Sequence, residues 1–132
     1  MKRSLAHSIA LLIMTLMLAA CSSSTQPEET VERFFNAAAK GDSDTAIEQI
    51  SFAGVGANDM AAAKGKIQMI AGQMQSQIES NGGIESLETL ESTISEDGQH
   101  ATVRTRVTFG NGQSTTDQTR LVKQDGDWKI TL

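Results

Sequence analysis

The sequence predicts an α+β domain in which three N-terminal helices pack on a four-stranded antiparallel sheet. Apolar residues recur at helical spacing over residues 27–80 and mostly at every second position over residues 84–132. Short clusters of Gly, Asn, Asp and Gln separate the strand-like segments, as expected of hairpin turns. A sheet of this kind has one apolar face, and we expect the three amphipathic helices to cover it.

An N-terminal segment, residues 1–20, precedes this domain. Lys2 and Arg3 form a short basic region, and the run from Ile9 to Leu18 is apolar apart from Thr15. This apolar core fits the roughly 7–15 residues of a signal peptide and is shorter than the roughly 18 residues that a membrane-spanning helix needs. We therefore expect residues 1–20 to be a signal peptide for export.

The segment Leu18-Ala19-Ala20-Cys21 resembles the lipobox of bacterial lipoproteins. The resemblance implies that the signal is cut before Cys21 and that a diacylglycerol, with palmitate-type acyl chains, is attached to its sulfur. Two or three such chains anchor a protein firmly, since each buried methylene contributes about 0.8 kcal/mol. Ser22 follows Cys21 in place of an Asp, and in this it resembles lipoproteins destined for the outer membrane. In a Gram-negative cell the resemblance implies the periplasmic face of that membrane. The alternative is a cleaved signal with an unmodified Cys21.

Residues 21–26 read as the lipidated cysteine and a polar linker. The five residues after Cys21 span about 17 Å at most, so we expect the domain to lie close to the cell-envelope membrane. Loss of Lys2 and Arg3 with the signal changes the formal net charge from −5 to −7. Such an acidic surface argues against nucleic-acid binding and against charge-driven adhesion to anionic lipids. Because Cys21 is the only cysteine, the fold must be held by packing without disulfides.

The first helix is expected from Pro27, which suits an initial turn, to Lys40, with Gly41 ending it. A second, shorter helix is expected from Asp42 or Ser43 through about Ser51. A third is expected from Asn58 or Asp59 to about Ser80. Its buried face comprises Ile67, Ile70, Ala71, Met74 and Ile78. Gly65 and Gly72 each weaken this helix by about 1 kcal/mol relative to Ala, which favours a kink or a split.

Four strands joined by tight turns are expected after Gly83. The first runs through Leu87, Leu90 and Ile94, whose mixed parity indicates a bulge. The second alternates cleanly over residues 100–109. The third covers Ser114 to Lys123 and is rich in threonine, so its pattern leaves open which side chains face inward. The last contains Trp128, Ile130 and Leu132.

Four segments together resemble the DUF4878 lipoprotein domain, a member of the NTF2-like (cystatin-like, SnoaL-like) superfamily. These are residues 31–37, the Gly41-Asp42 break, Gly82-Gly83-Ile84 and residues 125–130. The resemblance covers residues 27–132 and implies a curved sheet wrapped around a long helix, which forms a cone with an internal hollow. Candidate residues for the lining of that hollow are Phe34, Phe35, Met74, Val103 and Trp128.

NTF2-like enzymes such as ketosteroid isomerases place an Asp, His or Tyr inside the cone for proton transfer. This chain has no tyrosine, and His100 falls beside a turn on the polar face of its strand. Glu88 and Asp117 lie within strands, and either would become a general base if it pointed inward and were buried. No catalytic residue is otherwise assigned.

Three further groups of residues are considered as sites for metal, phosphate or anion binding. Asp97-Gly98 and residues 125–127 hold carboxylates close together but lack the remaining ligands of a calcium loop, so we interpret them as hairpin turns and expect no metal or cofactor. Gly54 and Gly56 lack the strand and third glycine of a phosphate loop. Arg104 and Arg106 share one strand face, where they either clamp an anion or pair with acids on a solvated surface.

The sequence therefore favours a lipid-anchored envelope module that binds a small apolar ligand or an envelope protein without catalysing a reaction. The alternative is a small SnoaL-like enzyme acting on a hydrophobic substrate in the cone. A third possibility is a homodimer formed through the open sheet face. An inward carboxylate in a hollow of roughly 300 Å³ or more would favour a ligand binder or an enzyme, and a filled cone would favour a scaffold.

Overall fold

The computed structural model describes residues 26–132; the predicted signal peptide, Cys21 and residues 22–25 lie outside the described residues. Three helices precede four strands, in the order α1 (Pro27–Lys40), α2 (Ser43–Glu48), α3 (Met60–Ser80), β1 (Ile84–Ile94), β2 (His100–Phe109), β3 (Ser114–Gln124) and β4 (Asp127–Ile130). The predicted number and order of elements are confirmed. Within this part of the chain, no helix combines the length and the apolar character that crossing a bilayer requires.

The helix ends follow local capping rules. Gly41 ends α1 in the left-handed region at φ 71°, as predicted, and Asp42 caps α2 by accepting a hydrogen bond from the Thr45 N–H at 3.1 Å. However, α2 ends at Glu48 rather than at about Ser51. The next residues lie beside β4: the Ile130 N–H donates to the Gln49 carbonyl at 2.7 Å, and the Ser51 N–H donates to the Ile130 carbonyl at 2.8 Å. This pairing competes successfully with a last helical turn.

Helix α3 is one continuous α-helix from Met60 to Ser80, so the predicted split is wrong. Gly65 and Gly72 are both exposed, and an added Cβ at either position would meet nothing within 4 Å. The glycines therefore lie on the solvent side, where they lower helix propensity without interrupting packing. The opposite face buries Ile67, Ala71 and Ile78, as the sequence predicted.

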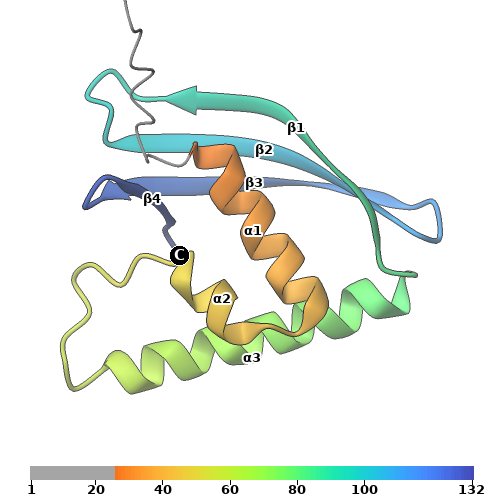
Figure 1. Ribbon diagram of the computed structural model, residues 1–132, viewed down its shortest axis with the longest axis horizontal. Coiled ribbons are helices and arrows are strands. Elements are labelled where there is room, and N and C mark those ends of the chain that lie inside the picture. The colour runs from red at the N-terminus through yellow and green to blue at the C-terminus, as the bar shows by residue number, and fades with distance from the viewer. Residues whose placement is uncertain (1–25) are drawn as a thin grey trace, which may run out of the picture.

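The strands form one antiparallel sheet in the order β1-β2-β3-β4, as the ribbon shows (Figure 1). The odd-numbered residues of β2 from Ala101 to Val107 are buried, as their alternation predicts. The irregularity predicted for β1 is also present and consists of two bulges. The register with β2 shifts between Ile84 and Ser86 and again between Thr89 and Glu91. Each shift inserts one unpaired residue and bends the strand.

The main core lies between α1 and the concave face of the sheet. Its largest fully buried apolar side chains include Val31 from α1, Val103 and Val107 from β2, and Leu121 from β3. Side chains at these positions are almost completely buried from solvent, and the burial of each contributes roughly 1.5–3 kcal/mol to the free energy of folding. Thr30 adds a buried hydrogen bond from its hydroxyl to the Trp128 carbonyl at 3.1 Å.

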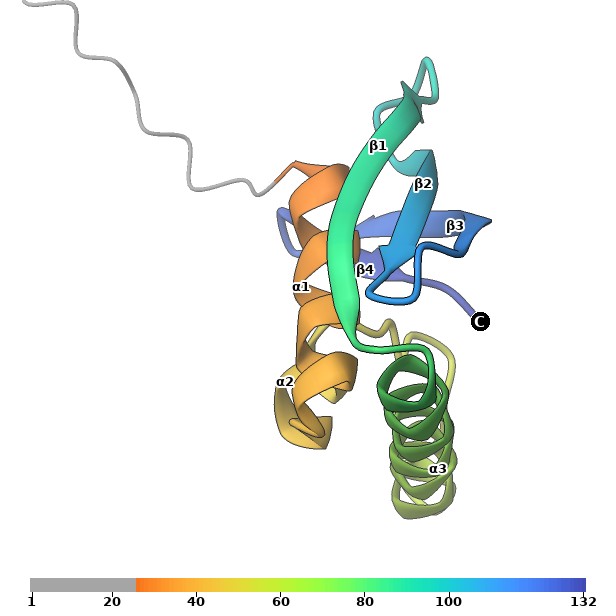
Figure 2. The ribbon, with the colours of Figure 1, turned by 90° about the vertical axis from the view of Figure 1, so that its right-hand side faces the viewer.

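Helix α3 adds Ile67 to this core but is not one of its two main layers. It packs on α1 and α2 and makes few contacts with the strands. Both ribbon views show it on the β3–β4 side of the sheet, standing away from the sheet face that α1 covers (Figures 1 and 2).

The C-terminal end of α3 is fixed by two loops that meet face to face. The Gly110 N–H donates to the Gly83 carbonyl at 3.0 Å, and the Asn111 N–H donates to the Asn81 carbonyl at 2.9 Å. The side-chain Nδ2 of Asn111 also donates a hydrogen bond to the side-chain Oδ1 of Asn81 at 3.0 Å. These bonds attach the turn after α3 to the β2–β3 hairpin and so set the distance between α3 and β3.

Candidate functional site

A groove runs between α3 and β3. It consists of two adjoining hollows of about 420 Å³ and 440 Å³, which share Phe35, Met74 and Asp117 as lining residues. The first hollow is further lined by Gln77, Ile78, Asn81, Val107, Phe109, Gln113, Ser114 and Thr115. The second is further lined by Phe34, Ile70, Gln118, Thr119, Arg120, Ile130, Thr131 and Leu132. Each hollow is in the size range of small-molecule binding sites.

Asp117 lies where the two hollows meet. It is the Cα partner of Thr105 across the β2–β3 ladder, and directly opposed residues project to the same face of a sheet. Since Thr105 is buried in the concave face, the register resolves the orientation of β3 that the sequence left open. Asp117 makes no hydrogen bond or ion pair with any described side chain, and its carboxylate is exposed in the groove.

Three of the five residues predicted to line the hollow do so: Phe34, Phe35 and Met74. Val103 and Trp128 do not line either hollow. Val103 is fully enclosed in the core, and Trp128 is buried beneath Lys123, whose Nζ lies 5.8 Å from the ring centroid. The difference arises because α1 fills the space over these two residues, whereas α3 stands off from β3.

The expectation of a buried base fails for both candidates. Glu88 is exposed and lies opposite Arg106, with its carboxylate 3.2 Å from the guanidinium. Glu91 and Arg104 form a matching pair at 3.4 Å on the same exposed face. The arginines therefore belong to a solvated, charge-paired surface rather than to an anion clamp. Asp117 reaches the groove, but it is exposed as well.

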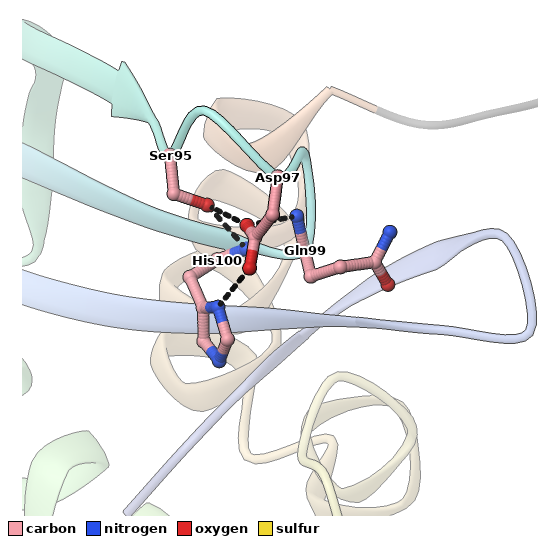
Figure 3. A network of polar contacts seen from close by, with 4 residues as sticks. All are labelled: Ser95, Asp97, Gln99 and His100. Carbon is pink, nitrogen blue, oxygen red and sulfur yellow. Dashed lines mark hydrogen bonds and ion pairs between the residues drawn. The ribbon is translucent and has the colours of Figure 1, made fainter.

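The β1–β2 turn is a second cluster of polar groups (Figure 3). Asp97 accepts hydrogen bonds from the Ser95 hydroxyl and from the Gln99 N–H, the latter at 3.0 Å. These two bonds, in that order, lower the pKa of the Asp97 carboxyl, and the nearby His100 adds to the effect. His100 Nδ1 lies 3.7 Å from Asp97, and its side chain is exposed beside the turn, as predicted. The network stabilises the β1–β2 hairpin.

Within residues 26–132, no three His, Cys, Asp or Glu side chains come together as metal ligands. Asp125 and Gly126 instead occupy a tight turn in which both have positive φ, at 51° and 85°. This is the hairpin conformation that the sequence indicated for residues 124–127.

Neither end of the groove was predicted from the sequence. Gln77, Asn81 and Gln113 form a polar rim at one end, and Leu132, which is 79% exposed, lies at the other. Leu132 was expected on the inward face of the last strand, but β4 ends at Ile130. The signal that could have indicated this end of the groove is Leu132 itself, an apolar residue two positions after the end of β4.

A family model described as "Domain of unknown function (DUF4878)" matches residues 19–131. The chain belongs to this family. No curated protein matches the sequence of this DUF4878 domain. A crystal structure of a candidate NTF2-like transpeptidase from Campylobacter jejuni superposes with a TM-score of 0.74 at 21% sequence identity, covering 82% of this chain and 99% of the other.

A second solved structure is a SEC-C motif containing protein from Rhodopseudomonas palustris. It superposes with a TM-score of 0.53 at 20% identity and covers 84% of this chain and 77% of its own. At these identities the likeness extends to the fold. The DUF4878 domain described here therefore shares its fold with the NTF2-like protein from Campylobacter jejuni.

Proposed function

We propose that this DUF4878 protein is a lipid-anchored, non-enzymatic binding module of the bacterial cell envelope, and that the groove between α3 and β3 is its binding site. The observation that carries the binding role is the pair of adjoining hollows with apolar side chains on both walls. Ligand sites combine such apolar walls with a few placed polar groups, and Asp117 supplies one at the centre.

The anchor is proposed from the lipobox at residues 18–21 and the short linker that follows. Metabolic labelling with radioactive palmitate tests it directly. We expect label on the wild-type protein and none on the Cys21→Ala variant, which should also leave the membrane fraction or retain its signal peptide. Equal labelling and equal partitioning of the two proteins would refute the anchor while leaving the groove proposal intact.

The second candidate function, a small SnoaL-like enzyme acting on a hydrophobic substrate, has one observation in its favour, since Asp117 faces the groove. Proton transfer usually needs a base together with a group that stabilises the developing charge. Among the described residues that line the groove, Asp117 is the only acid, Arg120 is the only cation, and none is a histidine or a cysteine. This composition favours binding over catalysis.

The groove is tested with an apolar fluorophore, N-phenyl-1-naphthylamine, which brightens in apolar sites. We expect saturable binding to the wild-type domain and a several-fold weaker affinity for Met74→Lys, which places an ammonium at the centre of the groove. Met69→Lys is the matched control, because Met69 lies on the same helix, is 58% exposed and lines neither hollow. Unchanged binding by Met74→Lys would exclude the groove as the binding site.

A further inference from the structure

Part of β3 is an open sheet edge. The strand pairs with β2 from Ser114 to Val122, but β4 covers only Leu121 to Gln124 on the other side. The Thr131 N–H extends this cover by one bond, to the Arg120 carbonyl at 2.9 Å. Residues 114–119 therefore have a strand on one side only.

The ladder determines which backbone groups are free. Phe109 donates its N–H to the Gln113 carbonyl, and Lys123 donates to the Gln99 carbonyl, so the odd-numbered residues of β3 bond to β2. The even-numbered residues Thr116 and Gln118 consequently direct their N–H and C=O groups away from β2. Neither residue has a hydrogen-bond partner among the described residues on that side. Unpaired groups of this kind are a template for an additional strand.

The other open edge, β1, is less suited to pairing. Its two bulges interrupt the regular spacing of backbone groups, and three glutamates, Glu85, Glu88 and Glu91, carry negative charge along it. Bulges and charged side chains are the usual means of blocking an edge strand. Over residues 114–119, β3 has no bulge and a single charged residue, Asp117.

The groove lies beside the free edge of β3, and its chemistry specifies what would pair there. A residue placed opposite Asp117 would face the groove, as would the residues two positions before and after it. These flanking residues would reach the two hollows: one contains Val107 and Phe109, and the other contains Phe34 and Ile70. The groove thus presents an apolar region, a carboxylate and, in succession, a second apolar region that Arg120 also lines.

We infer that the β3 edge binds an extended peptide with the pattern apolar-x-basic-x-apolar, whose basic side chain pairs with Asp117. This inference rests on the proposed function and names its ligand class. A second copy of the chain suits the edge less well. Two β3 strands centred on Asp117 would place two carboxylates directly opposite each other, and like charges in that position are destabilising.

The test uses the full chain and a capped probe peptide, Thr-Leu-Thr-Lys-Thr-Leu-Thr, monitored by titration calorimetry and amide NMR spectra. We expect binding with the largest shifts at the Thr116 and Gln118 amides. A peptide with Glu in place of Lys should bind roughly five- to tenfold more weakly. A Leu-Thr-Thr-Lys-Thr-Thr-Leu control, which moves both leucines to the other strand face, should lose most of the binding.

Two variants examine the two parts of the inference. Asp117→Lys should reverse the preference, so that the Glu peptide binds more tightly than the Lys peptide. Thr116→Pro removes one free edge N–H without removing a bond to β2, at a residue that lines neither hollow, and it should abolish peptide binding while the domain stays folded. Retained fluorophore binding in Thr116→Pro would show that the groove is intact.

Several outcomes overturn the inference. These are peptide binding without shifts at Thr116 and Gln118, equal affinity for the Lys and Glu peptides, or concentration-dependent dimerisation that Thr116→Pro abolishes. If the peptide does not bind while the fluorophore still does, the peptide ligand is refuted and the proposed function is unaffected. Failure of both would refute the proposed function as well.

Discussion

Gly82 and Gly110 contact each other backbone to backbone, where the turn after α3 meets the β2–β3 hairpin. A Cβ added to Gly110 would lie 2.3 Å from the Gly82 carbonyl oxygen, closer than real Cβ atoms approach. The position of α3, and with it the width of the groove, therefore depends on the absence of a side chain at residue 110.

Gly110→Ala is expected to destabilise the domain. The new methyl group must displace backbone rather than the end of a flexible side chain, and overpacking of this kind costs about 1–3 kcal/mol. Urea unfolding followed by circular dichroism measures the loss. Because the strain falls on the joint that positions α3, fluorophore binding should weaken too; a variant of wild-type stability would disprove the close contact.

Replacing glycine by alanine should instead increase stability at two positions in α3. Gly65→Ala and Gly72→Ala are expected to stabilise the domain by roughly 0.5–1 kcal/mol each, because Ala restricts the unfolded chain and favours a helix. Neither added Cβ meets an atom within 4 Å. Thermal unfolding provides the measurement, and a loss of stability at either site would mean that α3 needs local flexibility there.

Two buried threonines are expected to respond differently to valine. The Thr30 hydroxyl donates to the Trp128 carbonyl, whereas the Thr105 hydroxyl is buried without a partner. Thr30→Val leaves the carbonyl unpaired and should cost about 1–3 kcal/mol, while Thr105→Val should be neutral or stabilising. Chemical denaturation of both variants checks this, and equal losses would contradict the hydrogen-bond assignment.

Asp97 is expected to contribute to stability in a pH-dependent way. Hydrogen bonds from Ser95 and Gln99 hold the pKa of its carboxyl below the ordinary 3.8 in the folded state. A depressed folded-state pKa gives stabilisation that is complete above the unfolded-state pKa and disappears as pH falls through the folded-state pKa. Carboxyl ¹³C NMR titration should therefore give a midpoint below 3.8.

Ser95→Ala provides the specific variant for this titration. Removing the hydroxyl donor should raise the Asp97 pKa toward its ordinary value and reduce the acid-side stability difference. Ser92→Ala is the control, because Ser92 lies three residues earlier, near the end of β1, is exposed and makes no side-chain hydrogen bond among the described residues. An Asp97 midpoint that Ser95→Ala leaves unchanged would remove Ser95 as the cause.

Local signals were sufficient to predict most of the fold. The alternation in β2, the glycine after α1 and the turn residues around Asp97 each specify a backbone conformation within a few residues. The odd parity of Leu87 likewise indicated an irregular β1, although it did not reveal two bulges.

The remaining features depend on contacts between distant segments. Helix α2 stops early because residues 49–51 pair with β4, some eighty residues later in the chain. The inward face of β3 is undefined by its own threonine-rich sequence and is set by the register between Thr105 and Asp117. The groove exists because α3 stands off from β3, and no single segment encodes that separation.

The seating of β4 between β3 and residues 49–51 has a consequence for the order of folding. The strand joins the sheet through Leu121 and joins the helical half through Ile50 and Thr30, a residue 98 positions away from Trp128. Until β4 has been synthesised, the N-terminal helices lack this link to the sheet, so the nascent chain is expected to remain loosely structured. Such long-range closure makes for slow folding and a comparatively long-lived unfolded precursor.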